Sequence, residues 1–524
     1  MAQYQVLDCT LRDGGYYTGW DFDTGLVERY LKCFDDLPVS YVEVGYRSPS
    51  QAGYFGEYYY LPLKRLKWIR EVLNKNTKLA VMVDEKSCPP DAIDELLEPC
   101  RGLVDLVRFT AAPTRIPQTL LLAQRAKAAG FEVALNLMYL STLDPGNPAF
   151  AEIAAAGDTI DYVYLVDSYG AVTPDQLGPL MAWAKDALPQ PIGFHGHDNI
   201  GLAFANALVA AQHGAEIIDV TVQGMGRGAG NLQTELLVSY MTSKANPPLD
   251  LSRLARLSSE FQEMKAEFGW GMSFPYILSG FNNLPQKDVM DWLGMRRFST
   301  PSIVRALQSN GVAGEGLGNV PDFAAQVQGL GVAKGAPVLI MGGGDCGRRA
   351  VDSLVEFAER NDVLVIHSSL TRLADFAGAK VRQIVCLAGD EPLRLSEVLP
   401  GLTVLPELFV LSADHRGAMP PSELADRLAK VETPMIQGGD AGAVNRMLQG
   451  ESPANLALTV AQACGPDTIY LAGFDGYADG DRAIGVETQA TFEAFKARQP
   501  QTQLLSLTPT RYDLPEGSVY GFIA

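Results

Sequence analysis

The chain lacks the features that would direct it to a membrane or to an oxidising compartment. No apolar run approaches the roughly 18–20 residues that a membrane-spanning helix needs. The N-terminal residues MAQYQVLDCTLRDGG contain neither the basic region nor the long apolar stretch of a signal peptide. The 7 cysteines are scattered, odd in number and without a CxxC pair, which favours free thiols over disulfides or a zinc knuckle. We therefore expect a cytoplasmic protein.

Basic residues are also in short supply. The chain has 42 Lys and Arg against 61 Asp and Glu, a formal net charge of −19. Nucleic acids and anionic membranes bind clustered Lys and Arg, so we expect neither as a partner. An arginine or a metal inside a cleft could still attract an anionic small molecule. The 47% hydrophobic and 20% charged residues are ordinary for a globular protein, and 524 residues allow two or three domains.

Eight short apolar runs alternate with amphipathic, helix-length segments in the first part of the chain. The runs are QVLDCT (5–10), YVEVGY (41–46), LAVMVD (79–84), LVRFT (106–110), VALNLMY (133–139), YVYLVDS (162–168), IGFHGHD (192–198) and IIDVTVQG (217–224). Strict alternation of strands and helices predicts a parallel sheet of the α/β class. Eight strands predict closure into a (β/α)₈ TIM barrel over residues 1–245, with an open, doubly wound sheet as the alternative.

The rest of the chain divides into three parts. Residues 246–310 are expected to form a helical extension, and the glycine-rich residues 311–336 a linker. Over residues 337–524 a second α/β pattern is irregular in its period, which favours an open Rossmann-like sheet over a second barrel. Its apolar runs are PVLIMGGG, VLVIHSS, RQIVCLAG, ELFVLSA, PMIQGG, TIYLAGFDG and QLLSLTP.

Polar side chains gather where the barrel strands end, which is where barrel active sites lie. They are Arg12, Asp13, Glu43, Asp167, His195, His197 and Asn231. Side chains two apart on a strand point to the same side, so His195 and His197 project together into the barrel mouth. With the carboxylate of Asp13 they suit a divalent metal, Mn²⁺ or Mg²⁺ first and Zn²⁺ as a further choice. A hydrogen-bonded pair of structural histidines is the alternative.

Four segments in order resemble the motifs of a known family. LDCTLRDGG, LVDSYGAVTP, HGHDNIGLAFANALVAAQHGA and GMGRGAGNLQTE, within residues 4–240, are similar to metal-dependent barrel lyases and synthases. That family includes 3-hydroxy-3-methylglutaryl-CoA lyase, isopropylmalate synthase and 4-hydroxy-2-oxovalerate aldolase. The resemblance implies that Asp13, His195 and His197 hold the metal, often joined by Asn231. It also implies that Arg12 steadies an enolate oxygen, and that acidic residues act near the metal and substrate, here Glu43 and Asp167.

Departures from the family pattern bear on the reaction. The loop from Gly224 to Asn231 lacks the cysteine of the thioester-cleaving lyases and the Gly-Glu-Arg turn of the acetyl-CoA-condensing synthases, and is closest to the aldolase form. The histidine base that those aldolases place after the RDG turn is missing. Tyr16, Tyr46 or Tyr276 could move the proton instead, or could be packing residues.

Two further groups of residues are candidates for binding. Arg47 and Arg108, near the ends of the second and fourth strands, could bind a substrate carboxylate or could pair with acidic neighbours. In the second α/β region, Gly342, Gly344 and Gly347 fit GxGxxG between a strand and a helix, a pattern that can bind phosphate. His367 and Ser368 stand where a dinucleotide fold has an acidic residue, which disfavours NAD.

Together these observations predict a metal-dependent aldolase. It would join a 2-oxo acid, most simply pyruvate, to an aldehyde that could be sugar-like, or reverse that step. The second region resembles, weakly, Rossmann-like phosphotransferase or glycosyltransferase domains found beside carbohydrate-biosynthesis enzymes, and would bind a nucleotide or phosphosugar or serve as a scaffold. A Claisen-type acyl-CoA synthase and a non-catalytic assembly barrel are the alternatives. Family resemblance also implies a homo-oligomer, with residues 246–310 as its interface.

Overall fold

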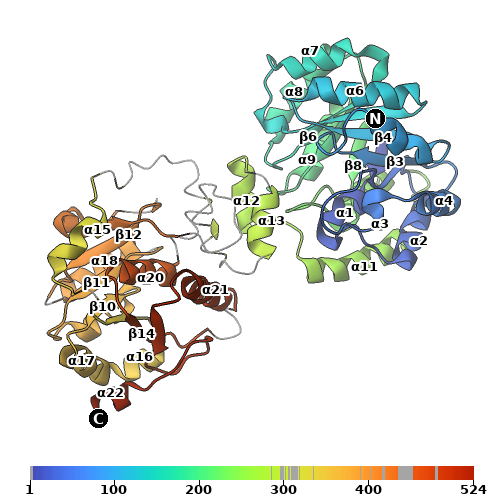
Figure 1. Cartoon of the computed structure of the whole chain (residues 1–524). Coiled ribbons are helices and arrows are strands. Elements are labelled where there is room, and N and C mark those ends of the chain that lie inside the picture. The colour runs from blue at the N-terminus through green and yellow to red at the C-terminus, as the bar shows by residue number, and fades with distance from the viewer. Residues whose placement is uncertain are drawn as a thin grey trace. The chain divides into compact units, whose positions relative to one another are not determined.

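The computed structural model describes residues 4–524 except 285, 295–299, 301–302, 305–306, 308–316, 318, 334, 390, 403, 416–418, 435–451 and 478–481. The chain divides into two compact units, Met1–Met290 and Asp291–Ala524, which are coloured blue to green and yellow to red in Figure 1. No helix among the described residues combines the length and the apolar character needed to cross a membrane.

The first unit is a closed, eight-stranded parallel barrel, which confirms the predicted fold class. The last strand pairs with the first, Gln5 opposite Ile217 and Asp8 opposite Val220. The strands are β1 (Gln5–Asp8), β2 (Tyr41–Tyr46), β3 (Lys78–Val83), β4 (Leu106–Ala111), β5 (Glu132–Leu137), β6 (Tyr162–Asp167), β7 (Ile192–Gly196) and β8 (Ile217–Val220). Their ends lie within a few residues of the apolar runs that predicted them.

Helices follow the strands and cover the outside of the barrel (Figure 1). They are α1 (Thr10–Thr18), α2 (Thr24–Cys33), α3 (Glu57–Tyr60), α4 (Leu63–Val72), α5 (Ile93–Leu97), α6 (Ile116–Ala128), α7 (Pro148–Ala155), α8 (Pro174–Ala187), α9 (Ala203–Gln212) and α10 (Thr234–Thr242). Three more follow, α11 (Ser252–Phe268), α12 (Phe274–Phe281) and α13 (Gln286–Gly294). The predicted helical extension therefore begins within the same compact unit as the barrel.

The barrel interior changes character along its axis. An apolar layer, which includes Leu7, Tyr41, Leu106 and Ile217, fills the end where the strands begin. Two residues further along, three of the strands carry charged side chains, Glu43, Arg108 and Asp219, and all three are buried. Because alternate residues of a strand face the same side, the interior passes from apolar contacts to an ionic network toward the mouth.

The second unit is an open, seven-stranded parallel sheet in the order β13-β12-β11-β10-β9-β14-β15, which confirms the prediction of an open sheet. Its strands are β9 (Val338–Met341), β10 (Leu364–His367), β11 (Gln383–Cys386), β12 (Leu408–Ser412), β13 (Leu428–Val431), β14 (Thr468–Ala472) and β15 (Gln503–Ser506). The direction of winding reverses at β9, so the loops after β9 and β14 meet at the switch point of the sheet.

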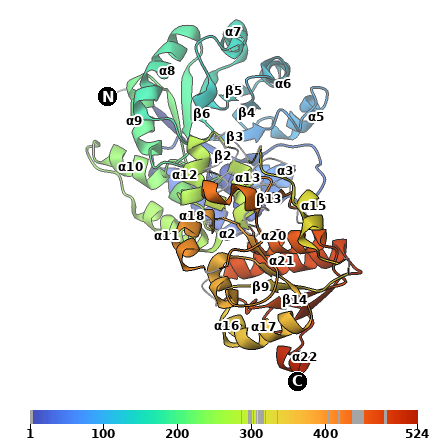
Figure 2. The same cartoon turned by 90° about the vertical axis from the view of Figure 1, so that its left-hand side faces the viewer.

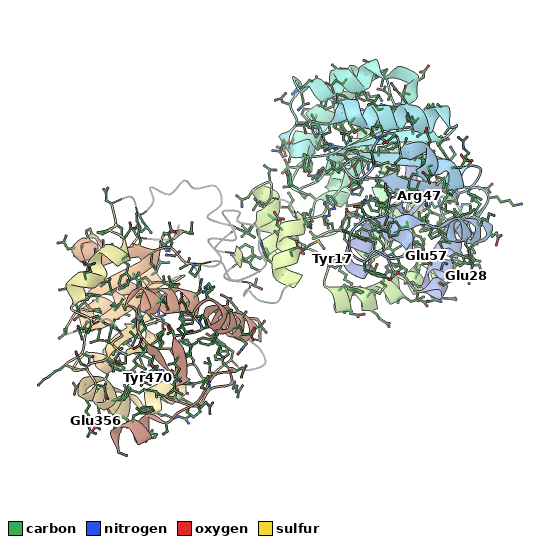
Figure 3. The ribbon with its side chains drawn as sticks, viewed as in Figure 1. Tyr17, Glu28, Arg47, Glu57, Glu356 and Tyr470 are labelled. Carbon is green, nitrogen blue, oxygen red and sulfur yellow. The ribbon has the colours of Figure 1, made fainter. Side chains whose placement is uncertain are left out.

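Helices pack on both faces of this sheet (Figure 2). They are α15 (Phe323–Gln326), α16 (Asp345–Arg349), α17 (Val351–Arg360), α18 (Glu391–Val398), α20 (Pro453–Ala463), α21 (Arg482–Arg498) and α22 (Val519–Ile523). Val338 and Ile340 join one core with α20 and α21, and Leu339 and Met341 join the other with α17 and α22. On this second face Tyr470 packs edge-on against Phe357 (Figure 3).

One detail differs from the sequence-based expectations, and one predicted strand lies outside the described residues. The predicted linker includes α15, whose Phe323 is fully buried in the core of the second unit, so this part is folded structure. The predicted strand PMIQGG lies, apart from Pro434, outside the described residues. The edge strand of the sheet is instead Leu428–Val431, a short segment whose last two residues are only partly buried.

Candidate metal centre

Three side chains predicted to bind a metal meet at the mouth of the barrel. Asp13 lies in the first turn of α1, His195 lies in β7 and His197 follows it. One ligand atom from each lies within 4.8 Å of those of the other two. The Nε2 atom of His195 is 3.7 Å from Oδ2 of Asp13, and the two imidazole centroids are 5.0 Å apart. These distances leave room for one small cation between the three groups.

Hydrogen bonds at the far side of each imidazole fix its orientation. Nδ1 of His195 lies 2.9 Å from Oδ2 of Asp219, and Nδ1 of His197 lies 2.8 Å from the backbone carbonyl of Asp167. A ring that donates from Nδ1 keeps the lone pair of Nε2 for a metal. Burial, and then the neighbouring His195, lower the pKa of His197 to about 3, so this ring is neutral at physiological pH.

Asn231 adds a fourth polar group from the loop after β8. Its Nδ2 donates to Oδ2 of Asp13 at 2.5 Å, while its Oδ1 is buried without a hydrogen-bond partner among the described residues. A Cβ at Gly226 would lie 2.3 Å from the Asn231 amide and 3.1 Å from Asp13 Oδ2, so only glycine fits there. One carboxylate, two imidazoles and an unpaired amide oxygen form a donor set that suits a divalent cation.

The carboxylate of Asp13 is kept ionised by its surroundings. Burial alone would raise the pKa of Asp13, but the Arg12 guanidinium, the two histidines and the Asn231 amide together lower it well below its usual range. Arg12 donates from NH1 to Asp13 Oδ1 at 2.7 Å and from Nε to Glu43 Oε2 at 2.7 Å. The carboxylate is therefore available as an anionic ligand.

A buried ionic network supports the centre from below. Arg108, which has no exposed surface, donates to Glu43 at 3.2 Å, to Asp219 at 2.5 Å and to Asn136 at 3.2 Å. Its guanidinium also lies 4.0 Å from the ring centroid of Tyr164. Because Glu43 orients Arg12 and Asp219 orients His195, Arg108 connects both sides of the centre.

The cavity above the centre has a volume of about 120 Å³. Of the predicted residues, Arg12, Asp13, Tyr16, Tyr46, His195 and His197 line it. The hydroxyls of Tyr16 and Tyr46 are 3.1 Å apart. Other lining residues were not predicted: Met82, Thr110, Asn136, Met138, Tyr139, Val166, Ser168, Tyr169, Arg227 and Gln286.

Five predicted residues lie elsewhere. Arg47 donates to the backbone carbonyls of Tyr60, Leu61 and Leu96 and does not line the cavity, so its contacts are structural (Figure 3). Arg108 and Glu43 are sealed in the network, which does not fit a direct substrate-binding role for Arg108. The Asp167 carboxylate accepts the backbone N–H groups of Gly170, Ala171 and Val172, and Tyr276 is buried in α12 outside the cavity lining.

Comparison with known proteins is consistent with this geometry. Residues 116–260 match the family described as HMGL-like. A 4-hydroxy-2-oxovalerate aldolase from Brevibacillus brevis is 31% identical over 239 residues, which are 45% of this chain and 69% of the relative. An oxaloacetate decarboxylase from Mycobacterium tuberculosis is 28% identical over 292 residues, 54% of this chain and 84% of the relative.

The chain belongs to the HMGL-like family. The resemblance predicted from the four motifs is thereby confirmed. A crystal structure of the N-terminal domain of a presumed aldolase from Bacteroides vulgatus is 40% identical, covers 58% of this chain and 99% of that domain, and superposes with a TM-score of 0.54. The named relatives are aldolases and a decarboxylase, enzymes whose reactions break carbon–carbon bonds.

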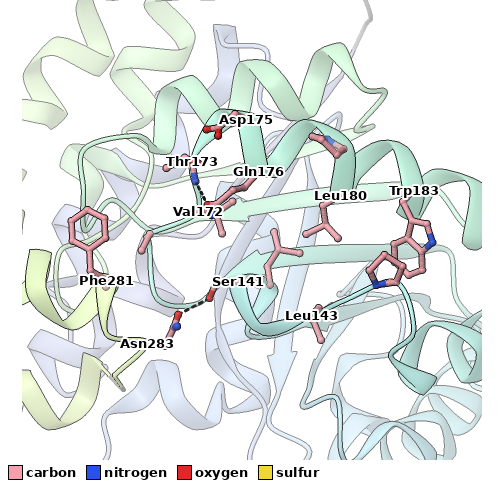
Figure 4. A pocket seen from close by; sticks show the side chains of 15 residues that line it. Ser141, Leu143, Val172, Thr173, Asp175, Gln176, Leu180, Trp183, Phe281 and Asn283 are labelled. Atoms are coloured by element: carbon pink, nitrogen blue, oxygen red, sulfur yellow. Dashed lines mark hydrogen bonds between the residues drawn. The ribbon is translucent and has the colours of Figure 1, made fainter. Parts of the chain in front are cut away.

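The first unit also contains a larger cavity of about 600 Å³ (Figure 4). Tyr139 and Tyr169, whose ring centroids are 5.5 Å apart, line the small cavity, and residues that follow each of them line the large one. Ser141 donates to Asn283 across it at 2.8 Å. Its lining includes Leu180 and Trp183 and one carboxylate, the exposed Asp175, so it contains no comparable set of metal ligands.

The glycine-rich loop of the second unit has a structural explanation. A Cβ at Gly344 would lie 2.4 Å from Asp475 Oδ1, and one at Gly342 or Gly347 would collide with Gly473. Asp475 accepts the backbone N–H of Cys346 at 2.8 Å, at the start of α16. The three glycines allow the loop after β14 to approach closely, and a carboxylate lies where a phosphate would have to bind. The nucleotide or phosphosugar binding predicted from the sequence is therefore not needed to explain this loop.

Proposed function

We propose that the first unit is a divalent-metal-dependent aldolase that joins a 2-oxo acid, most simply pyruvate, to an aldehyde and catalyses the reverse cleavage. The observation that carries the proposal is the convergence of Asp13, His195 and His197 beside Arg12. The aldolase relatives support the same reaction class. Mn²⁺ or Mg²⁺ suits the oxygen-rich part of this donor set, and Zn²⁺ is compatible with its imidazoles.

In the cleavage direction the C3–C4 bond of a 4-hydroxy-2-oxo acid breaks. Its electron pair moves to C3 to give an enolate, the C4 hydroxyl loses its proton to become the aldehyde carbonyl, and protonation at C3 gives the 2-oxo acid. A bound metal would supply Lewis-acid polarisation of the 2-oxo carbonyl. Arg12, permanently charged and held by Glu43 and Asp13, contributes a second positive group for the developing enolate charge.

We assign the hydroxyl proton to the Tyr16–Tyr46 pair. Both residues line the cavity and their hydroxyls are 3.1 Å apart, whereas Tyr276 does not line it. Burial, and then the neighbouring Tyr16, raise the pKa of Tyr46 well above its usual value, so Tyr46 stays protonated as a hydrogen-bond donor. A phenol can take the C4 proton only as it passes its own proton on, so we assign the pair as a relay that moves the proton from the C4 hydroxyl toward C3, directly or through water.

The test is release of pyruvate from 4-hydroxy-2-oxo acids, measured with a lactate-dehydrogenase-coupled assay. We expect EDTA to abolish turnover and Mn²⁺ to restore it. The control is His213→Gln. His213 is exposed and lies outside the cavity lining, so this variant should release pyruvate at the wild-type rate. Metal-loaded protein that releases no pyruvate from any such substrate would contradict the proposal.

Decarboxylation of a 2-oxo diacid is a second candidate, favoured by the M. tuberculosis relative. Loss of CO₂ from C3 of such an acid leaves the same enolate as aldol cleavage does, so Arg12 would serve both reactions. Turnover of oxaloacetate above its spontaneous rate, sensitive to EDTA, would support this candidate.

A further inference from the structure

A second arginine in the cavity has no role in the chemistry described above. Arg227 lies between Gly226 and Gly228 in the loop after β8, and it is the only cationic side chain besides Arg12 among the described residues that line the cavity. The loop is held from two sides. The hydroxyl of Tyr17 donates to the carbonyl of Gly228 at 3.0 Å, and the backbone N–H of Ala229 donates to Gln286 in α13 at 3.3 Å.

Arg227 has no ion-pair partner among the described residues, although the Tyr16 hydroxyl and, at longer range, Asp13 interact with its charge. Arg12 pairs with two carboxylates, but no carboxylate described here lies within ion-pair distance of Arg227. Its Nε is buried without a hydrogen-bond partner among these residues, and its guanidinium carbon lies 3.9 Å from the centroid of the Tyr16 ring. Both oxygens of Asp13, the acid that lines the cavity, already accept hydrogen bonds from Arg12 and Asn231. Arg227 is partly buried, and a cation that faces a cavity without a carboxylate partner would be stabilised by an anionic ligand.

Arg227 comes from the loop after β8, whereas Arg12 comes from α1. The carboxylate of a 2-oxo acid is bonded to its keto carbon, so it must remain beside the metal ligands and Arg12. Arg227 stands instead across the Tyr16 ring, whose hydroxyl belongs to the proposed proton-transfer pair. The cavity therefore has two arginines, and the one stacked on Tyr16 is next to the pair that we assign to the C4 hydroxyl, on the carbon that becomes the aldehyde.

We propose that Arg227 binds an anionic group, a carboxylate or a phosphate, on the aldehyde partner. The substrates would then be 4-hydroxy-2-oxo acids that carry a second negative charge beyond C4. This inference rests on the proposed aldolase function. It also separates the two candidate reactions: an aldehyde keeps its anionic group throughout cleavage, whereas a carboxylate lost as CO₂ becomes neutral. A cation that binds the leaving carboxylate stabilises the ground state and opposes decarboxylation.

The experiment compares matched acceptors in the addition of pyruvate. Succinate semialdehyde is paired with butanal to test a carboxylate, and glyceraldehyde 3-phosphate with glyceraldehyde to test a phosphate. We expect the wild type to prefer the anionic member of one pair, and that pair identifies the group. Arg227→Met should lower kcat/KM for that acceptor by about 10- to 150-fold, the range for a hydrogen bond to a charged group. The neutral acceptors should change little, and Arg227→Lys should retain part of the preference.

Two outcomes would overturn the inference. One is a wild type without preference for either anionic acceptor, which needs no variant and so does not depend on whether a variant folds. The other is an equal loss in Arg227→Met for charged and neutral acceptors, or a raised KM for pyruvate, either of which would place Arg227 at the 2-oxo acid. Exchange of the C3 protons of pyruvate in D₂O needs no acceptor. Absent exchange and absent product in the wild type would instead reject the aldolase function itself.

Discussion

The two units place loops at the ends of parallel strands in the same way, yet they use them differently. In the barrel, Asp13, His195 and His197 face a cavity and are held from behind by Arg12, Asp219 and the backbone of Asp167. In the second unit, the glycine-rich loop after β9 meets the loop after β14, and the carboxylate of Asp475 takes the free N–H at the start of α16.

This difference teaches how a sequence motif becomes a site. In the HxH motif each Nδ1 already has a hydrogen-bond partner. The Nε2 lone pairs therefore stay available for a metal, and both face the cavity. In the GxGxxG motif the backbone N–H of Cys346 donates to the carboxylate of Asp475, which belongs to the same domain. A motif binds a ligand when its polar groups face a cavity, and it is structural when they face one another.

The largest expected effect comes from breaking the network that supports the first site. Arg108→Met would remove the buried cation that Glu43 and Asp219 share and would leave Asp219 without an arginine partner, so we expect the free energy of unfolding to fall by about 3–5 kcal/mol. Denaturant unfolding of the full chain measures it. Arg125→Met, which removes an exposed ion pair with Asp94, is the matched control and should cost less than about 1 kcal/mol. Equal effects of the two variants would show that the network adds nothing.

Acid should destabilise the second unit through His367. Burial lowers the pKa of this fully buried histidine from 6.5 to about 4. Below pH 6.5 the unfolded chain therefore binds a proton that the folded chain does not, so stability falls as the pH falls from 6.5 toward 4. The loss from this residue is about 3 kcal/mol. Unfolding measured across this range should show a smaller loss in His367→Gln than in the wild type, and parallel curves would contradict the assignment.

A smaller effect is expected where the network meets the metal site. Asp219→Asn removes the charged acceptor of the His195 Nδ1 proton, and we expect affinity for Mn²⁺ to fall by about 10- to 100-fold. Titration calorimetry on metal-stripped protein measures the affinity. Asp175→Asn, at an exposed acid that lines the larger cavity, should leave it unchanged. Unchanged affinity in Asp219→Asn would remove Asp219 from the support of the centre.

The smallest effect concerns the loop of the second unit. Asp475→Ala should lower the free energy of unfolding by about 1–2 kcal/mol, since it removes one hydrogen bond to a charged group. We expect wild-type protein to show no binding of inorganic phosphate or ATP in equilibrium dialysis at millimolar concentration. Tight binding of phosphate or ATP by the wild type would contradict the difference between the two units, because the glycine-rich loop would then also be a ligand site.

Much of the fold could be predicted because strand and helix patterns are local. Every barrel strand coincides with an apolar run, since parallel strands are buried on both faces. The edge strand Leu428–Val431 escaped prediction because it is short, contains Lys430 and is only partly buried. Tertiary contacts also extend the first unit beyond the predicted barrel, as Gln286 of α13 hydrogen-bonds Asn199 at 2.7 Å.

The convergence of the three candidate ligands could be predicted from the sequence, whereas the residues that support them could not. His195-Gly196-His197 and Arg12-Asp13 signal themselves by residue type and spacing. Asp219 stands in an apolar strand, IIDVTV, where its spacing from Ile217 places it inside the barrel, and that signal could have identified it. Arg227 lies in the motif GMGRGAGN, whose interpretation depended on its glycines. Gln286 gave no signal, because its contact depends on where α13 packs.

The most direct measurement is the binding of Mn²⁺ to metal-stripped protein, followed by the electron paramagnetic resonance signal of free Mn²⁺. We predict one Mn²⁺ bound per chain in the wild type and in Asp175→Asn. Asp13→Asn and His197→Ala should each lose that binding while their circular dichroism spectra stay those of the folded wild type. Binding of Mn²⁺ that persists unchanged in both variants would contradict the account, because the carboxylate and the imidazole would then not share one cation.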